Sequence, residues 1–554
     1  MRSNVKQCLV SLALAAAVSG CGQDTSEPAV EAARAEISIE RYRADVSTLS
    51  SDEFEGRAPS SEGERKTVEY LIEGFKAAGA VGGNDGEFTQ AVPLVAITAT
   101  EVSPLRIGTE DGAIELAPGR QAVTWTKQVV ESVAVDESPM VFVGYGIVAP
   151  EYGWNDYEGV DVAGKTVVML VNDPGFVTGD DALFTGRRMT YYGRWTYKFE
   201  EAARQGATGA ILVHETEAAG YPWLVVAGGW TGPQFDLERE NGNADRAVFE
   251  GWISSASANE VFDAAGMDFA ASAQAATQRG FKAQPMPTTA SVSISNSLER
   301  SNSQNVVALL PGDEAPDEYV AFSAHWDHLG IVDNGEEDGV FNGAVDNATG
   351  TAAMLELARV LGAEPRRRSL LFVVVTAEES GLLGSAWFAQ NPTVPLERTA
   401  GLINIDAMSI IGPTRDVTMI GYGSSSLQDY LTAAAAAQSR TVEDEPTPEK
   451  GFFYRSDHFN FAKAGVPVLY AKGGVDHLVH GREYGQTALA EHTSTRYHRP
   501  SDEIHEGWDF DGLLADLELY RSVAERLANT DDWPIWSEQS EFRGVREASK
   551  SARE

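Results

Sequence analysis

The chain has 554 residues, 43% of them hydrophobic and 9% aromatic, so it is globular and long enough for at least two domains. It carries 82 Asp and Glu residues against 43 Lys and Arg residues, which gives a formal net charge of −39 at pH 7. This negative charge argues against nucleic acid or an anionic membrane surface as a partner.

The first 21 residues are typical of a lipoprotein signal peptide. A basic start precedes an apolar stretch from Cys8 to Val18, which is too short to span a bilayer. This stretch ends in Val18-Ser19-Gly20-Cys21, which resembles the bacterial lipobox. The resemblance implies that Cys21 becomes the lipidated first residue. Gly22 follows instead of Asp, so retention in the inner membrane is not signalled. We expect an exported lipoprotein anchored in the outer membrane and facing the periplasm or exterior; the alternative is an ordinary signal peptide with an incidental cysteine.

Cys8 and Cys21 are the only cysteines, so no disulfide can form within the mature chain. Residues 22–36 are small, polar and acidic, which predicts a flexible tether. Apolar residues at helical spacing follow between about 37 and 80, and we assign residues 37–97 to the first part of an α/β domain.

Residues 98–296 have a different pattern, with many short β-type runs broken by Gly, Pro and Asp. Within them, residues 198–215 predict a helix, a glycine turn and a buried strand. We therefore expect an inserted β-rich domain. It has no cluster of His, Cys and carboxylate residues, and we expect its His214 to be structural.

Residues 297–530 alternate apolar strands with helices, which predicts a mostly parallel central sheet flanked by helices, an α/β fold. The expected strands are 305–310, 319–324, 369–377, 400–405, 417–423 and 466–472. The expected helices are 351–362, 426–438, the stretch after Ser456, and 511–529. Residues 531–554 are predicted to be a charged and loosely packed C-terminal tail.

Five metal-type ligands lie near predicted strand ends or loops of this second part. They are His325, Asp346, Glu379, Asp406 and His498. Two imidazoles and three carboxylates are too many for one four-coordinate zinc, but they suit two zinc ions bridged by one carboxylate. A further carboxylate, Glu378, directly precedes Glu379 and could act as a base. The pattern indicates a two-metal hydrolase.

Some neighbouring residues are assigned supporting roles. Asp327 could accept the second N–H of the His325 imidazole and so fix its tautomer. His328 is not expected to be a ligand. Tyr497 could donate a hydrogen bond to a developing oxyanion, or could be a packing residue. Taken alone, Asp346 could equally be a helix N-cap.

The motifs HWDH, GAVDNATG, TAEESGLLGS, NIDA and RYHRPSDE occur in the order seen in the M28 family of zinc metallopeptidases. The chain from about residue 37 to 530 resembles that family. The segment MVFVGYGIVAPEYGWNDYEGVDVAGKTVVMLVNDP resembles a protease-associated (PA) domain, which a subset of the family carries inside the catalytic domain. The resemblance implies that the catalytic domain is interrupted by residues 98–296.

The resemblance also implies a role for each motif residue. His325 and Asp406 would bind one Zn²⁺, Glu379 and His498 the other, and Asp346 would bridge both. Glu378 would be the general base. Many relatives have Asp-Met where this chain has Asp406-Ala-Met-Ser, which leaves the shape of the pocket open.

A further matching segment, GFFYRSDHFNFAKAGVPVLY, contains residues that could line the substrate pocket. These candidates are Tyr454, Arg455, Ser456, Asp457 and His458; for His458, a structural or supporting role is the main alternative.

We expect a peptidase acting on peptide or protein substrates, foremost an aminopeptidase. A carboxypeptidase or dipeptidase would need a cationic pocket, for which Arg187, Arg188 and Arg455 are candidates. A single-zinc glutaminyl cyclase is disfavoured because all five ligand positions are filled. A non-catalytic receptor on the same fold is a further alternative, although no ligand or base is missing.

Overall fold

The computed structural model describes residues 34–332 and 338–553. The predicted signal peptide, the predicted lipidation site Cys21 and most of the predicted tether lie outside the described residues. Within the described ranges, no helix combines the length and the apolar character needed to cross a membrane.

The first described segment consists of two helices, as the sequence predicts. Helix α1 spans Ile39–Leu49 and α2 spans Glu62–Ala77. The hydroxyl of Ser61 caps α2 by accepting the backbone N–H of Glu64. Between the helices lies a 3₁₀ segment, Asp52–Arg57, which carries the buried Arg57 toward the end of the central sheet.

The central sheet is mostly parallel at its middle, which confirms the predicted fold class. Strand β14 (Ala315–His325) pairs in parallel with β17 (Arg368–Val375) on one side and with β18 (Thr399–Asn404) on the other. Strand β21 (Val468–Gly473) extends the parallel set beside β18, and on the other side β13 (Gln284–Leu310) pairs antiparallel with β17. Strands β19 (Asp416–Ile420) and β20 (Thr441–Asp444) continue the sheet beyond β21.

Side chains alternate between the two faces of this sheet, and each face has its own helical layer. Phe322 of β14 stacks on Phe372 of β17, and Phe372 contacts Phe75 of α2. The neighbouring Ala321 and Leu371 point to the opposite face, into the core that includes residues of α10 (Leu383–Gln390) and α12 (His458–Lys463). The face that carries Phe322 and Phe372 is covered by α2 together with α9 (Thr349–Gly362), α11 (Leu427–Ala437) and α14 (Phe510–Ala528).

Four of these helices match the predicted ones, whereas α10 and α13 (Arg482–Thr495) were not predicted. Only Gly485 of α13 is buried, so this helix has no apolar stripe for a periodicity argument to detect. Helix α10 is short, and its first three residues, Leu383 to Ser385, belong to the GLLGS sequence.

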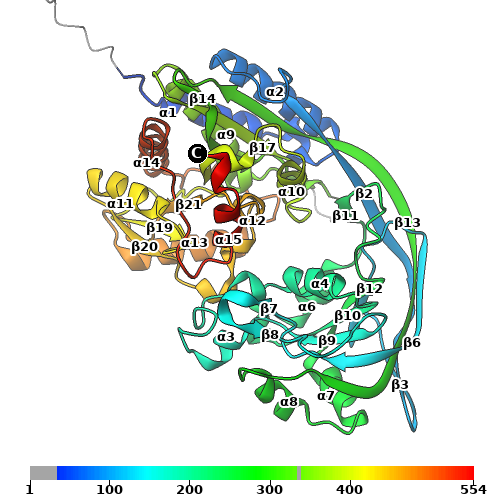
Figure 1. Cartoon of the computed structure of the whole chain (residues 1–554). Coiled ribbons are helices and arrows are strands. Elements are labelled where there is room, and N and C mark those ends of the chain that lie inside the picture. Colours follow the sequence, from blue (N-terminus) through cyan, green and yellow to red (C-terminus); the bar gives the residue numbers. More distant parts are fainter. Residues whose placement is uncertain (1–33, 333–337, 554) are drawn as a thin grey trace, which may run out of the picture. The chain divides into compact units, whose positions relative to one another are not determined.

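Two long antiparallel strands connect the part of the chain that forms the parallel sheet to the inserted region, residues 98–296, and they are visible at the right of Figure 1. Strand β2 (Thr89–Val102) pairs along most of its length with β13, for example Ile97 with Leu298. The domain boundaries assigned from the sequence, at residues 97/98 and 296/297, therefore fall inside paired strands and not in loops. Continuous hydrogen bonding across both boundaries argues against a flexible linker there.

The inserted region has cores of its own, built around four strands. Strands β6 (Ser132–Phe142), β9 (Thr166–Leu170), β10 (Gly209–His214) and β12 (Phe249–Ser254) pair in parallel in that order. Helix α4 (Trp195–Arg204) precedes β10, so the helix, turn and strand expected at residues 198–215 are confirmed. His214 is buried and its Nε2 lies 3.0 Å from the carbonyl oxygen of Tyr221, which agrees with a structural role.

The prediction of a loosely packed C-terminal tail was wrong. Trp536 is 1% exposed, and its indole N–H donates to the carbonyl of Gly465 at 3.0 Å. Phe542 packs on Trp536 and Phe453, and helix α15 (Arg543–Ala548) follows. The high density of charged residues in this stretch hid the apolar positions that bury it.

Candidate metal centre

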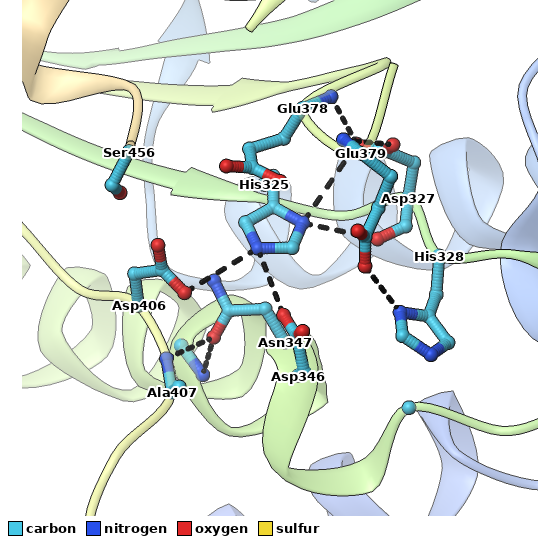
Figure 2. A network of polar contacts seen from close by, with 12 residues as sticks. His325, Asp327, His328, Asp346, Asn347, Glu378, Glu379, Asp406, Ala407 and Ser456 are labelled. Atoms are coloured by element: carbon cyan, nitrogen blue, oxygen red, sulfur yellow. Dashed lines mark hydrogen bonds and ion pairs between the residues drawn. The ribbon is translucent and has the colours of Figure 1, made fainter. Parts of the chain in front are cut away.

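The predicted ligands meet at one end of the central sheet because parallel strands end at the same edge. His325 is the last residue of β14, Glu378 and Glu379 follow β17, and Asp406 follows β18. Asp346 lies in the turn before α9. Figure 2 shows these side chains converging from their separate loops.

One ligand group consists of His325, Asp346 and Asp406, whose donor atoms lie within 4.8 Å of one another. His325 Nε2 is 3.2 Å from Oδ1 of Asp346 and 3.5 Å from Oδ1 of Asp406. All three were predicted as metal ligands, and the structure brings them together.

A second group shares Asp346 and adds Glu379 and two histidines. His498 Nε2 lies 3.2 Å from Oδ2 of Asp346 and 3.0 Å from Oε2 of Glu379. His328, Asp346 and Glu379 also satisfy the 4.8 Å criterion. His328, which was not expected to be a ligand, thus lies within the second group, where its Nδ1 is at hydrogen-bond distance, 2.6 Å, from Oε1 of Glu379.

Asp346 faces both groups, with one carboxylate oxygen toward His325 and the other toward His498. Asp502 holds its backbone in place: the N–H groups of Val345 and Asp346 donate to the Asp502 carboxylate at 3.1 Å each. Burial raises the pKa of Asp502 to about 6, against the lowering effect of these two backbone donors. Sequence reasoning missed Asp502, which lies four residues after His498 in the same motif.

Asp327 does not support His325 in the manner expected. Nδ1 of His325 lies 3.0 Å from the Asp327 backbone carbonyl and 3.8 Å from its carboxylate. The Asp327 carboxylate instead accepts the backbone N–H groups of Glu378 at 3.1 Å and Glu379 at 3.4 Å (Figure 2). Asp327 thereby fixes the direction of the two glutamates after β17.

The charges at this centre favour a cation. Burial raises the pKa of Glu378 well above its usual value; His325 opposes this rise, and the nearby carboxylates of Glu379 and Asp406 add to it. Burial alone would lower the pKa of His325, yet Glu378, Asp346 and Asp406 together hold that pKa well above 6.5. So many buried carboxylates are stable only with compensating positive charge. Imidazole nitrogens and carboxylate oxygens are the donors that zinc prefers, so the residues fit zinc.

Arg57 is a second residue that sequence reasoning missed. It is fully buried and donates to four backbone carbonyls: Trp326 at 2.8 Å, Leu49 at 2.5 Å, Asn342 at 2.7 Å and Gly343 at 2.9 Å. Burial lowers its pKa to about 10, and the surrounding carboxylates oppose that lowering. One guanidinium thus ties α1 to the loops that carry His325 and Asp346. Such a fork-shaped donor requires Arg.

The residues expected to line a substrate pocket are mostly buried and engaged in internal contacts. Ser456 accepts the Asn404 amide at 2.7 Å, and Asp457 accepts the Ser385 hydroxyl at 2.6 Å. Tyr454 donates to Glu541 at 3.0 Å. His458 is fully buried, its ring centroid 4.7 Å from that of Phe453, and burial lowers its pKa to about 3. A structural role for His458 follows.

Tyr497 is 46% exposed and its ring stacks on His498 at a centroid distance of 3.9 Å. It therefore lies beside the ligand group with its ring open to solvent.

Two of the three arginines considered for a cationic pocket are paired with carboxylates. Arg188 contacts Asp444 and, at 3.7 Å, Glu445. Arg187 lies 3.6 Å from Glu217. For Arg455 no ion pair is found within the described residues, and its side chain lies over the Phe452 ring at 5.2 Å.

Known proteins resemble the chain in this region. Residues 305–517 match the family model "Peptidase family M28". Aminopeptidase NAALADL1 of Rattus norvegicus is 35% identical over 150 residues, which cover 26% of this chain and 18% of that protein. A probable zinc metalloprotease of Pyricularia oryzae is 39% identical over 249 residues, covering 42% of this chain and 49% of the relative. The matches thus span less than two thirds of either relative.

Two solved structures resemble the chain at low identity. An aminopeptidase from Aneurinibacillus sp. strain AM-1 aligns with a TM-score of 0.49 at 20% identity, covering 90% of this chain and 96% of its own. BSAP, a zinc aminopeptidase from Bacillus subtilis, aligns with a TM-score of 0.42 at 17% identity, covering 92% and 97%. The stretch that matches the model of peptidase family M28, residues 305–517, includes all the predicted ligands of the metal centre.

Proposed function

We propose that the chain is an exported di-zinc peptidase that releases N-terminal residues from peptides. The observation that carries the proposal is the sharing of Asp346 between two ligand groups, with the spare carboxylate of Glu378 next to both. The names of the two relatives, an aminopeptidase and a probable zinc metalloprotease, support the same activity.

His325 and Asp406 would hold one zinc ion, Glu379 and His498 the other, and Asp346 would hold both. When bound, the two ions would supply Lewis-acid polarisation of a water molecule and of the scissile carbonyl. Glu378 would accept the proton of the attacking water and pass it to the leaving amine. Burial and the neighbouring carboxylates raise its pKa, which makes it a stronger proton acceptor than an ordinary carboxylate.

The decisive test is Glu378→Gln, measured as hydrolysis of aminoacyl-nitroanilides together with metal content. The proposal expects activity to fall at least 10²-fold while zinc content stays unchanged, because Gln keeps the volume but cannot accept the proton. Glu314→Gln, at an exposed position, is the matched control. Retained activity would remove Glu378 as base, and a wild-type protein that binds zinc without hydrolysing any peptide would favour the receptor alternative.

Arg455 favours a second candidate, a carboxypeptidase or dipeptidase. Burial lowers the pKa of its guanidinium, whereas Tyr221 and Tyr497 raise that pKa. The Arg455 guanidinium therefore lies within electrostatic reach of Tyr497, the tyrosine that stacks on His498. A free guanidinium there could receive a C-terminal carboxylate. Parallel assays with aminoacyl-nitroanilides and N-blocked dipeptides separate the two, and Arg455→Leu should impair only the second activity.

Export and lipid anchoring rest on residues 1–21 of the sequence. Cys21→Ser should abolish incorporation of labelled palmitate and release the protein from the membrane fraction. Residues 98–296 would serve as a PA-type specificity element beside the centre, without catalytic groups of their own.

A further inference from the structure

A cavity of about 330 Å³ lies where the inserted region, the parallel-sheet part and the C-terminal tail meet; we call it the junction cavity. Its lining comes from three parts of the chain: Thr185 and Arg188 to Thr190 from the inserted region, Gly421 to Ser424 and Phe453 from the parallel-sheet part, and Ser537 and Gln539 to Phe542 from the tail. None of the metal ligands lines it, so it is separate from the metal centre.

The junction cavity contains more negative than positive charge. Asp181, Glu445 and Glu541 line it, and Arg188 is its one lining guanidinium or ammonium group. Arg188 is already paired with Asp444 outside the lining and lies 3.7 Å from Glu445. An anionic ligand would therefore meet a neutralised guanidinium and three carboxylates.

Among these lining carboxylates, Glu445 gives the strongest indication that the cavity takes a positively charged ligand. The residue is 5% exposed, and its Oε2 is buried with no hydrogen-bond donor within reach among the described residues. Its other oxygen receives only the Gly421 N–H at 3.4 Å and the distant Arg188. Burial raises its pKa to about 7, and Asp444 and Glu449 act in the same direction. Apart from the ion pair with Arg188, the buried carboxylate is weakly compensated, because its Oε2 has no donor.

The remaining lining is aromatic and suits the body of an organic cation. Tyr152, Phe453 and Phe542 form walls, and Tyr422, which is 39% exposed, lies at the open side. Aromatic faces attract ammonium and guanidinium groups, and they also cover an apolar arm. The volume is in the range of small-ligand sites.

The donor set does not suit a bare metal ion. Across the part of the chain that the structure describes, the two groups able to hold a metal both lie at the metal centre. We propose that the junction cavity binds a small organic cation, an ammonium or guanidinium with an aromatic or apolar arm, with Glu445 as its counter-ion.

The test is calorimetric titration of the full-length zinc-loaded protein with 2-phenylethylammonium and, separately, with the neutral isostere 2-phenylethanol. The amine should bind at least tenfold more tightly than the alcohol. Glu445→Gln should weaken amine binding at least tenfold, whereas Glu449→Gln, a nearby glutamate that does not line the cavity, should leave it unchanged.

A second pair of variants guards against misfolding and against binding elsewhere. Tyr422→Ala changes an exposed wall residue and should weaken amine binding several-fold without altering the melting temperature. Asp406→Asn impairs the metal centre and should leave amine binding intact. The proposal is overturned if the amine and the alcohol bind equally, if Asp406→Asn abolishes binding while Glu445→Gln does not, or if Ca²⁺ alone binds in place of the amine. No outcome depends on peptidase activity, so this test and that of the proposed function fail independently.

Discussion

Nδ1 of His328 lies 2.6 Å from Oε1 of Glu379, and this contact orients a carboxylate that faces the second ligand group. His328 is 1% exposed, so its imidazole has no competing solvent. The contact places His328 either as a supporting donor to Glu379 or as a ligand in its own right. Both roles make it part of the metal centre.

His328→Phe should lower metal affinity by about 10- to 100-fold, because Phe keeps the ring but removes the donor that orients Glu379. Competition with a chelator of known affinity measures the change. His480→Phe replaces an exposed histidine and is the control. Unchanged affinity in His328→Phe would assign this histidine to packing alone.

Asp346→Asn should reduce the zinc content from two ions to one or none per chain. A carboxylate can serve two cations through its two oxygens, whereas the amide nitrogen of Asn cannot coordinate one. Elemental analysis after dialysis gives the stoichiometry, with the exposed Asp429→Asn as control. Two tightly held ions in the variant would show that Asp346 does not bridge.

Arg57→Lys should destabilise the fold by about 3 kcal/mol or more and weaken metal binding as well. Lysine keeps the positive charge, but it cannot serve four carbonyls at once, and unsatisfied buried carbonyls cost about 1–3 kcal/mol each. Urea denaturation of the metal-free and metal-loaded protein measures both effects. Arg120→Lys, at an exposed arginine, should change neither.

His458 should contribute to acid instability. Its pKa in the fold is about 3, below the ordinary 6.5, so the folded state binds fewer protons than the unfolded state between these values. Its stabilising contribution is complete above pH 6.5 and is lost as the pH falls toward 3. His458→Phe removes this dependence, so between pH 7 and pH 4 the variant should gain about 3 kcal/mol relative to the wild type. Denaturation at both pH values measures this difference; a constant difference would contradict a neutral buried imidazole.

Trp536→Ala should cost about 3–5 kcal/mol of unfolding free energy, because it empties a core position and removes the hydrogen bond to Gly465. Ile535→Ala changes the neighbouring residue, which is 55% exposed, and should cost less than about 0.5 kcal/mol. If both variants were equally stable, the tail would not be part of the cooperative fold.

The central strands and most helices were predictable because their apolar residues repeat with a clear period, as in β14, β17 and α9. Helix α13 was not, since it buries a single residue. The buried tail was missed because its charged residues mask Trp536 and Phe542.

By itself the sequence predicted the candidate ligands and the spare carboxylate Glu378, and it determined their positions near the ends of strands, because parallel strands bring such residues to one edge of the sheet. Only the tertiary structure decided which groups touch. In the structure the Asp327 carboxylate accepts the backbone N–H groups of Glu378 and Glu379 and does not contact His325 closely. The structure also places His328, Asp502 and Arg57 in contact with the metal centre or with the loops that carry it. Those contacts join residues far apart in the chain, and their distances depend on how loops pack, which no local pattern encodes.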